Sequence, residues 1–387
     1  MSIYSSPLFN RFPQDLKTSP GFWYELQTYE FDRPSFSKRP VDFAVRDPAR
    51  PWQEIAHGIF ILIAKIVIFP WGLYRLAKYI TQRSFMIPIY PAQSRLVKIF
   101  FKHWRVQGLQ EEISYRKRVT NMHKFLIRYL VLEKNGIRYS ALLLAHQDTL
   151  ANGKWVLQAT GNSAPIESFT PVEEVYRRNN FNTLLVNGPA VGNSQGQATL
   201  ESMGDAQEIG IQFLETALKA RKIILAADSI GRAALGEAIL KHDFKPDIKY
   251  LVISRVAFDR LSNIPAKVLG KIFKSSCIKS FIRRWIQWAN CEMDTVPASR
   301  KLASLGITEV IVQASRKKFE KEALPHPEDF ADDGVIPAHG CLGRRLIKEG
   351  ITQHKIFIGS QNLQHQFPNE YYEIAEVNEI ISRFSKA

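Results

Sequence analysis

From residue 125 onward, short apolar segments alternate with amphipathic segments of helical length, and this alternation limits the possible folds more than any other feature. The series opens with Phe125–Glu133 and Arg138–Ala145, which flank the turn dipeptide Asn135-Gly136 and predict a β-hairpin. A hairpin followed by strand–helix units predicts an α/β fold with a mostly parallel, doubly wound sheet. The later strands are predicted at Lys154–Thr160, Asn182–Asn187, Lys222–Asp228, Ile248–Ser254, Glu309–Ala314 and Lys355–Ile358, with helices near 172–179, 199–220, 230–242, 338–349 and 370–385.

The sequence before residue 125 has a different character. Residues 1–51 are rich in Pro, Ser, Arg and Asp and predict an irregular extension, and 52–124 form an apolar and basic helical segment. Within it, the apolar stretch Ala56–Ile80 reaches the length of a bilayer span, about 20 residues, only by crossing Lys65 and a Pro70-Trp71-Gly72 break. A Lys at the centre of a span costs roughly 2.5–3.5 kcal/mol. The segment therefore predicts either an interfacial membrane anchor or a helical hairpin packed on the α/β domain.

The α/β domain is expected to cover 125–387, with an insertion at 256–306. The insertion carries basic residues among Ile, Phe and Trp and predicts a cap over the strand ends; these residues are Lys271, Lys274, Lys279, Arg283 and Arg284.

The net charge of +15 favours polyanionic partners, either nucleic acid or an anionic membrane surface. Nucleic acid is the less favoured, since zinc-finger spacing, RNP-like aromatic motifs and zipper heptads are not found in the sequence.

The three cysteines have neither paired spacing nor a companion His cluster, so no disulfide framework, metal or other cofactor is expected. Met1 to Pro20 does not have a signal-peptide pattern, which favours a cytoplasmic or peripheral membrane location. The oligomeric state is left open.

Two serines are candidate nucleophiles. Ser194 lies in a literal G-x-S-x-G string, Gly192 to Gly196, but a loop of about ten residues separates it from the preceding strand. A nucleophile elbow requires a strand that passes directly into a helix. Ser229 has that context, between the apolar strand Lys222–Asp228 and a strong helix former, although Ala227 stands where Gly is usual. A helix N-cap is the alternative role for Ser229.

Residues further along the chain favour Ser229. A serine nucleophile needs a base and a carboxylate that orients the base, and in the α/β-hydrolase fold the chain order is Ser, acid, His. Asp333, with Asp332 as competitor, follows the strand Glu309–Ala314, and His365 follows the last strand. The alternative bases are His339, in the acid loop, and His354, at the other end of its strand.

The oxyanion hole of such a site needs two backbone N–H groups. One is expected from Ile230, immediately after the nucleophile, and the other from Gly161 or Asn162 in the loop after the first parallel strand.

Several of these segments resemble the chlamydial CHLPS-type hydrolase family, which has effector-like relatives in other intracellular bacteria. They are Thr160-Gly161-Asn162, Leu184 to Ser194, Asp228 to Gly231 and Asp333 to Pro337, together with Phe69 to Arg75 from the apolar segment. The resemblance implies an α/β-hydrolase fold, a catalytic triad and, if the protein is effector-like, delivery to a host cell. The chain departs from the family elbow at Ala227, Asp228 and Arg232.

Two hypotheses follow. The first is a serine hydrolase acting on an ester, thioester or amide, with an acyl or lipid-like small-molecule substrate. In it Ser229 attacks, His365 acts as base, Asp333 orients His365, and Ile230 with Gly161 or Asn162 binds the oxyanion. The second is an inactive hydrolase scaffold that serves as a membrane-associated interaction module.

Overall fold

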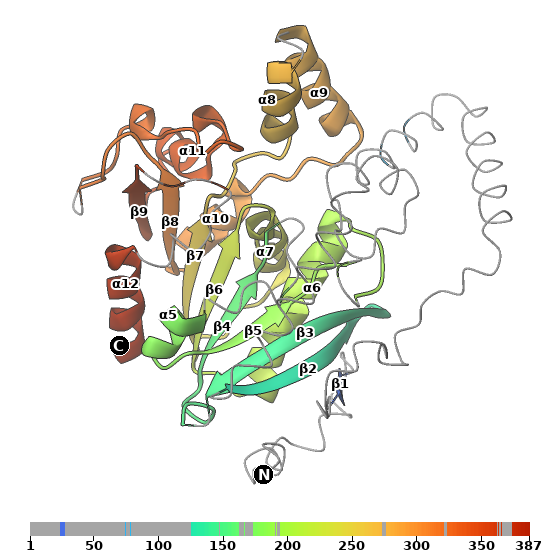
Figure 1. Ribbon diagram of the computed structural model, residues 1–387, viewed down its shortest axis with the longest axis vertical. Helices are drawn as coiled ribbons and strands as arrows, with labels where there is room; N and C mark the ends of the chain where they lie inside the picture. Colours follow the sequence, from blue (N-terminus) through green and yellow to red (C-terminus); the bar gives the residue numbers. More distant parts are fainter. Residues whose placement is uncertain are drawn as a thin grey trace, which may run out of the picture.

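A nine-stranded sheet forms the centre of the computed structural model, in the order β1-β2-β3-β5-β4-β6-β7-β8-β9 (Figure 1). The structure describes residues 24–27, 74, 78, 125–146, 148–161, 166, 173–189, 191, 194–272, 276–320, 323–361, 363, 365 and 374–387. The hairpin β2–β3 and its neighbour β5 pair antiparallel, and every pairing from β5 through β9 is parallel. This mostly parallel order confirms the α/β-hydrolase fold. The strands are β2 (Phe125–Lys134), β3 (Ile137–His146), β4 (Lys154–Ala159), β5 (Asn182–Val186), β6 (Lys222–Asp228), β7 (Lys249–Arg255), β8 (Thr308–Ala314) and β9 (Lys355–Ser360).

Helices cover both faces of the sheet (Figure 1). Side chains of α6 (Leu200–Gln212), α7 (Ile230–Lys241) and α10 (Val296–Ser304) form one buried cluster with the sheet. Side chains of α5 (Glu173–Arg178) and α12 (Ala375–Lys386) join a second cluster. Strands buried on both sides explain the continuous apolar runs of the sequence.

Helix boundaries differ from the sequence prediction at three places. The helix expected at 199–220 is α6 followed by a π-helical turn, Phe213–Ala217. The helix expected at 338–349 begins as a 3₁₀ turn, Ala338–Gly340, and continues as α11, Leu342–Lys348. The last helix begins at Ala375 rather than near 370. Hydrophobic periodicity does not distinguish a π or 3₁₀ turn from an α-helical one, so these boundaries were not visible in it.

The N-terminal extension contains one strand that the sequence did not predict. β1 (Tyr24–Gln27) pairs antiparallel with β2 at the sheet edge, so the prediction of an irregular segment at 1–51 is wrong at these residues. Four residues are too few for a visible alternation, and their pairing partner lies about a hundred residues away. Apart from Tyr74 and Lys78, Ala56–Ile80 lies outside the described residues. Within the described residues, no helix combines the length and apolarity needed to cross a membrane.

The interval 256–306 contains three helices with different surroundings. α8 (Asn263–Ile272) and α9 (Ser276–Trp288) pack together as a hairpin that projects from the body, whereas α10 packs on α7 (Figure 1).

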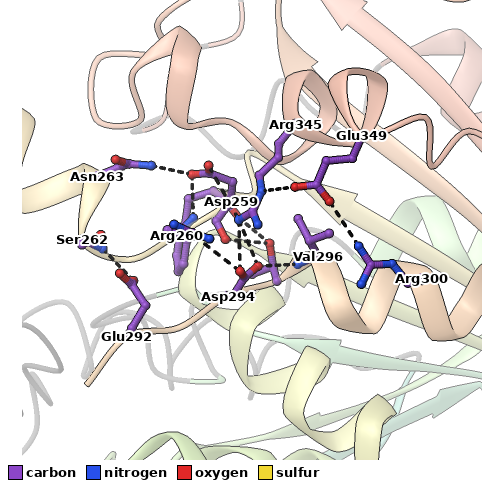
Figure 2. A network of polar contacts seen from close by, with 12 residues as sticks. Asp259, Arg260, Ser262, Asn263, Glu292, Asp294, Val296, Arg300, Arg345 and Glu349 are labelled. Carbon is purple, nitrogen blue, oxygen red and sulfur yellow. Dashed lines mark hydrogen bonds and ion pairs between the residues drawn. The ribbon is translucent and has the colours of Figure 1, made fainter. Parts of the chain in front are cut away.

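Polar contacts fix the base of the α8–α9 hairpin (Figure 2). Before α8, Asp259 accepts a hydrogen bond of 2.8 Å from the Asn263 amide. After α9, Asp294 forms an ion pair of 3.1 Å with Arg345 of α11. Arg345 also lies 4.0 Å from Asp259, so one guanidinium joins both ends of the hairpin to the body. The hairpin is therefore held in a defined direction.

Candidate active site

The turn between β6 and α7 holds Ser229 in a backbone conformation that is rare for any residue but glycine. Its φ is 51° and its ψ is −119°. The turn is fixed on both sides, because the Ser229 N–H donates to the Arg255 carbonyl (3.1 Å) and its own carbonyl accepts from Arg232 (3.0 Å). Ser229 occupies the N-cap position, yet its side chain makes no capping hydrogen bond in the described part of the chain. The N-cap alternative is therefore not supported, and the strain is typical of a functional site.

Two glycines allow the backbone to close around this turn. A Cβ on Gly231 would stand 2.5 Å from the Thr160 carbonyl oxygen and 2.6 Å from that of Ala159, so only glycine fits. A Cβ on Gly161 would lie 4.0 Å from the Cβ of Ser229. The loop that follows β4 thus lies against the Ser229 turn, where the sequence predicts the second oxyanion donor. Asn162, the other candidate in that loop, lies outside the described residues.

Ile230 is the first residue of α7. Its backbone N–H belongs to the first helical turn, whose donors have no partner within the helix. Its role as the first oxyanion donor stays a prediction.

Asp333 and His365 meet across two loops at the carboxyl ends of β8 and β9. Asp333 Oδ2 lies 2.9 Å from His365 Nδ1, and the His365 N–H donates to the Asp333 carbonyl at 2.9 Å. The other carboxylate oxygen accepts from the N–H groups of Val335 (2.9 Å) and Ile336 (2.6 Å). The carboxylate is thus fixed by its own loop and orients the imidazole through one ring nitrogen.

The competing acid and bases lie elsewhere. The Asp332 carboxylate is exposed and forms an ion pair with Lys267 of α8. His339 lies 3.2 Å from Arg283 of α9, and burial together with that guanidinium lowers the His339 pKa. His354 is exposed at the start of β9, the opposite end of the strand from His365, as the sequence predicts.

His365 lies within electrostatic range of the Ser229 turn. Burial raises the pKa of the Asp228 carboxyl, and the charges of Arg255 and His365 oppose that rise. Asp228 directly precedes Ser229. Although β7 and β8 lie between β6 and β9, the charge of His365 therefore acts on the residue that precedes the nucleophile candidate.

Ser194, the literal motif match, has a structural role in a different place. Its hydroxyl is buried, accepts from the Ser140 backbone N–H of β3 (2.9 Å) and donates to the Asn187 carbonyl (3.3 Å). These bonds fasten the loop after β5 to the antiparallel part of the sheet. A hydroxyl engaged in this way is not presented to a substrate.

Comparison with known proteins identifies the family of the chain. The model of the Chlamydia CHLPS protein family (DUF818) matches residues 52–385. The chain belongs to this family. Among curated proteins, none has a sequence that matches it.

Solved structures similar to the chain are α/β proteins of low sequence identity. An esterase from Pyrococcus furiosus is 12% identical and covers 68% of this chain and 91% of its own, with a TM-score of 0.48. An α/β hydrolase from Vibrio vulnificus is 13% identical and covers 65% and 80%, with a TM-score of 0.46. Est1E from Butyrivibrio proteoclasticus is 14% identical and covers 65% and 95%, with a TM-score of 0.44. Such likeness does not indicate an activity, and the fold is assigned from the strand order above.

The two charged departures from the CHLPS family elbow are each neutralised by a buried partner. Asp228 pairs with Arg255 at 2.6 Å and accepts a further hydrogen bond from Gln158 at 2.9 Å. The Arg255 carbonyl also accepts a hydrogen bond from the Ser229 N–H, so one residue of β7 pairs with the Asp228 carboxylate and binds the backbone of the turn. The ion pair of Asp228 with Arg255 thus stabilises the turn that carries Ser229.

Arg232, in the first turn of α7, has a fully buried side chain that lies 2.8 Å from Glu309 of β8. Gly236, one turn further on, makes room for it, since a Cβ there would stand 2.9 Å from the guanidinium. Burial would raise the pKa of Glu309, but the charges of Arg232 and Lys355 outweigh burial and hold that pKa at about 2. Arg232 is therefore part of the core and does not obstruct the strand ends.

Sequence reasoning did not identify Gln158, Arg255 or Glu309 as supports of the site. The available signal was a polar or charged residue within, or directly after, an otherwise apolar strand. Such a residue must find a buried partner, but the sequence does not name that partner.

Proposed function

We propose that the protein is a serine hydrolase that cleaves an ester, thioester or amide through an acyl-enzyme on Ser229. The observation that carries the proposal is the strained Ser229 turn combined with the Asp333–His365 pair at the same end of the sheet. A carboxylate that orients an imidazole is typical of a site that transfers protons. A serine on a strained strand-to-helix turn is typical of a nucleophile, because the turn exposes its hydroxyl.

In the proposed first step, Ser229 Oγ attacks the carbonyl carbon while His365 Nε2 takes the hydroxyl proton. The Asp333 carboxylate accepts the Nδ1–H bond of 2.9 Å, which fixes the tautomer and stabilises the imidazolium. The imidazolium then protonates the leaving oxygen, sulfur or nitrogen, and the acyl group remains on Ser229. A water molecule, deprotonated by His365, hydrolyses this ester and restores the serine.

The negative charge of the tetrahedral intermediate requires donors that are already in place. The backbone N–H of Ile230 and a backbone N–H from the Gly161 loop are the proposed pair. The close packing at Gly231 and Gly161 supports this assignment, because it brings the β4 loop and the start of α7 together beside Ser229.

The proposed substrate is an acyl or lipid-like small molecule. The support is the apolar and basic α8–α9 hairpin, which contacts the loop of the proposed acid through Lys267 and Asp332.

A fluorophosphonate probe tests the nucleophile, because it reacts with activated serines. Labelling is expected for the wild-type chain and for Ser194→Ala, and is expected to be lost in Ser229→Ala. His365→Gln and Asp333→Asn should each reduce hydrolysis of a p-nitrophenyl acyl ester by about 10⁴-fold. Labelling that survives Ser229→Ala but is lost in Ser194→Ala would refute the assignment. No labelling of a folded wild-type chain would favour the inactive scaffold.

A further inference from the structure

α9 exposes two aromatic rings, at Phe281 and Trp288, on either side of Trp285, which is half-buried and packs against the contact with α8. Phe281 and Trp288 are 61% and 47% exposed, high values for large apolar side chains. Trp285 lies between them, with ring centroids 5.8 Å from Phe281 and 5.7 Å from Trp288. The three residues follow helical spacing of four and three, so they form one ridge along the helix.

The opposite side of α9 makes the contacts that hold the hairpin together. Ile282, Ile286 and Ala289 are buried in a small cluster with Ala266 of α8. Trp285 packs against the edge of this cluster, whereas the exposed parts of Phe281 and Trp288 are an apolar surface outside it. Apolar residues exposed in this way mark an interaction surface.

The charge of α9 indicates what kind of partner the ridge fits. Its sequence, SCIKSFIRRWIQW, contains basic but no acidic residues. Arg284 is exposed and lies three residues after Phe281 and four before Trp288, on the same side of the helix. Lys279 and Arg283 are the other cations of α9. A helix with exposed aromatic residues whose charged side chains are all cationic is typical of binding in the interface of an anionic bilayer.

Two described residues of the N-terminal segment, Tyr74 and Lys78, lie at the C-terminal end of the ridge. Tyr74 lies with its ring 5.9 Å from that of Trp288, and Cys291, just after α9, contacts the Lys78 carbonyl. Tyr74 and Lys78, which belong to the segment that the sequence predicts as an interfacial anchor, thus lie at the end of the ridge. Aromatic rings and basic side chains together are characteristic of the membrane–water interface.

We propose that the ridge of Phe281, Trp285 and Trp288, with Arg284, is a docking surface for anionic lipid membranes. The fixed base of the hairpin keeps the ridge in a defined direction (Figure 2). α8 and α9 also contact the loop that carries Asp333, through Lys267–Asp332 and Arg283–His339. Docking therefore brings the strand ends to the lipid surface. That consequence for an acyl substrate rests on the proposed function, whereas docking itself does not.

Vesicle co-sedimentation of the full chain tests the surface, with phosphatidylcholine vesicles compared with mixed phosphatidylcholine–phosphatidylserine vesicles. The wild-type chain should bind the anionic vesicles, and binding should weaken as salt is added. Arg284→Gln should lower the partition coefficient about five-fold. Phe281→Ser should lower it about ten-fold, because an exposed phenyl group no longer enters the interface.

Two substitutions elsewhere are matched controls. Leu305→Ser removes an apolar side chain that is 49% exposed, and Arg383→Gln removes a cation on α12; both should bind as the wild type does. Absence of wild-type binding, or unchanged binding of Phe281→Ser and Arg284→Gln, overturns the proposal. A wild-type dimer that Phe281→Ser converts to a monomer, without vesicle binding, would assign the ridge to a second copy instead.

Fluorophosphonate labelling separates this proposal from the proposed function. Phe281→Ser and Arg284→Gln should label as well as the wild-type chain without vesicles, since neither residue belongs to the proposed triad. Ser229→Ala should bind vesicles normally. Labelling without vesicle binding refutes only the docking surface, and vesicle binding without labelling refutes only the hydrolase.

Discussion

Glu309→Gln removes the one carboxylate of a fully buried charge cluster beneath the Ser229 helix. Glu309 Oε1 lies 2.8 Å from Arg232 and accepts from Ser254 at 2.7 Å, and Glu309 Oε2 lies 3.2 Å from Lys355. Glutamine keeps the shape and loses the charge, which leaves two cations buried without a counter-charge. Arg232 is the main partner, because burial lowers the pKa of Lys355 despite the attraction of Glu309.

The magnitude follows from the pKa of Glu309, which falls from 4.5 to about 2 in the folded chain. At about 1.4 kcal/mol per pKa unit, the charged form stabilises the fold by about 3–4 kcal/mol. Removal of one partner from a buried ion pair costs roughly 3–5 kcal/mol, which agrees. We expect Glu309→Gln to lower the free energy of unfolding at pH 7 by about 3–4 kcal/mol.

The pH dependence has a definite sign. A carboxyl whose folded pKa is depressed stabilises the fold above its unfolded pKa, and that stability is lost as the pH falls toward the folded value. Wild-type stability from Glu309 should therefore decline between about pH 4.5 and about pH 2. Glu309→Gln lacks this component, so the difference between the two proteins should shrink over the same range.

Urea unfolding at neutral and acidic pH measures both effects. Glu379→Gln is the matched control, because Glu379 forms an exposed helical pair with Arg383 and should cost only about 0.3–0.5 kcal/mol. A Glu309→Gln variant as stable as the control at pH 7 would refute the reasoning. So would a stability difference from wild type that stays constant down to about pH 2.

Three further substitutions probe the site. Ser229→Gly should raise the free energy of unfolding by about 1 kcal/mol while it abolishes fluorophosphonate labelling, because glycine adopts a φ of 51° without strain. Gly231→Ala should both destabilise the fold and abolish labelling, since its methyl group meets the Thr160 carbonyl oxygen at 2.5 Å. Ser194→Ala should lower the free energy of unfolding by about 1 kcal/mol, because the half-buried Ser140 N–H loses its acceptor, and should label normally.

Each of these has a control or a contradicting outcome. Ser229→Ala separates loss of the hydroxyl from relief of strain, because alanine keeps the unfavourable φ and should not stabilise the chain as glycine does. Gly350→Ala, at a turn with φ of 69° and open space around it, controls for Gly231→Ala and should label fully. A Ser194→Ala variant as stable as the wild type would show that the Ser140 contact contributes little.

The sequence by itself determined the order of the elements and where the candidate site lies along the chain. An apolar run predicts the strand Lys222–Asp228, and helix propensity predicts the helix after it, so the junction at Ser229 can be located without a structure. The loops of Asp333 and His365 were found in the same way, because each follows a recognisable strand.

Candidates that are equivalent in the local sequence have different surroundings in the tertiary structure. Asp332 and Asp333 are adjacent and chemically alike, and the path of the acid loop places one beside His365 and the other beside Lys267. Ser194 has the better motif, but its pairing with β3 shows a structural role.

The same holds for the departures at Asp228 and Arg232, whose partners come from other strands. A hydrophobic pattern depends on residues that are close in sequence, whereas the partner of a buried charge depends on how segments tens of residues apart pack together. The position of the Ser229 turn can therefore be predicted from the local sequence. The contacts that support the turn cannot.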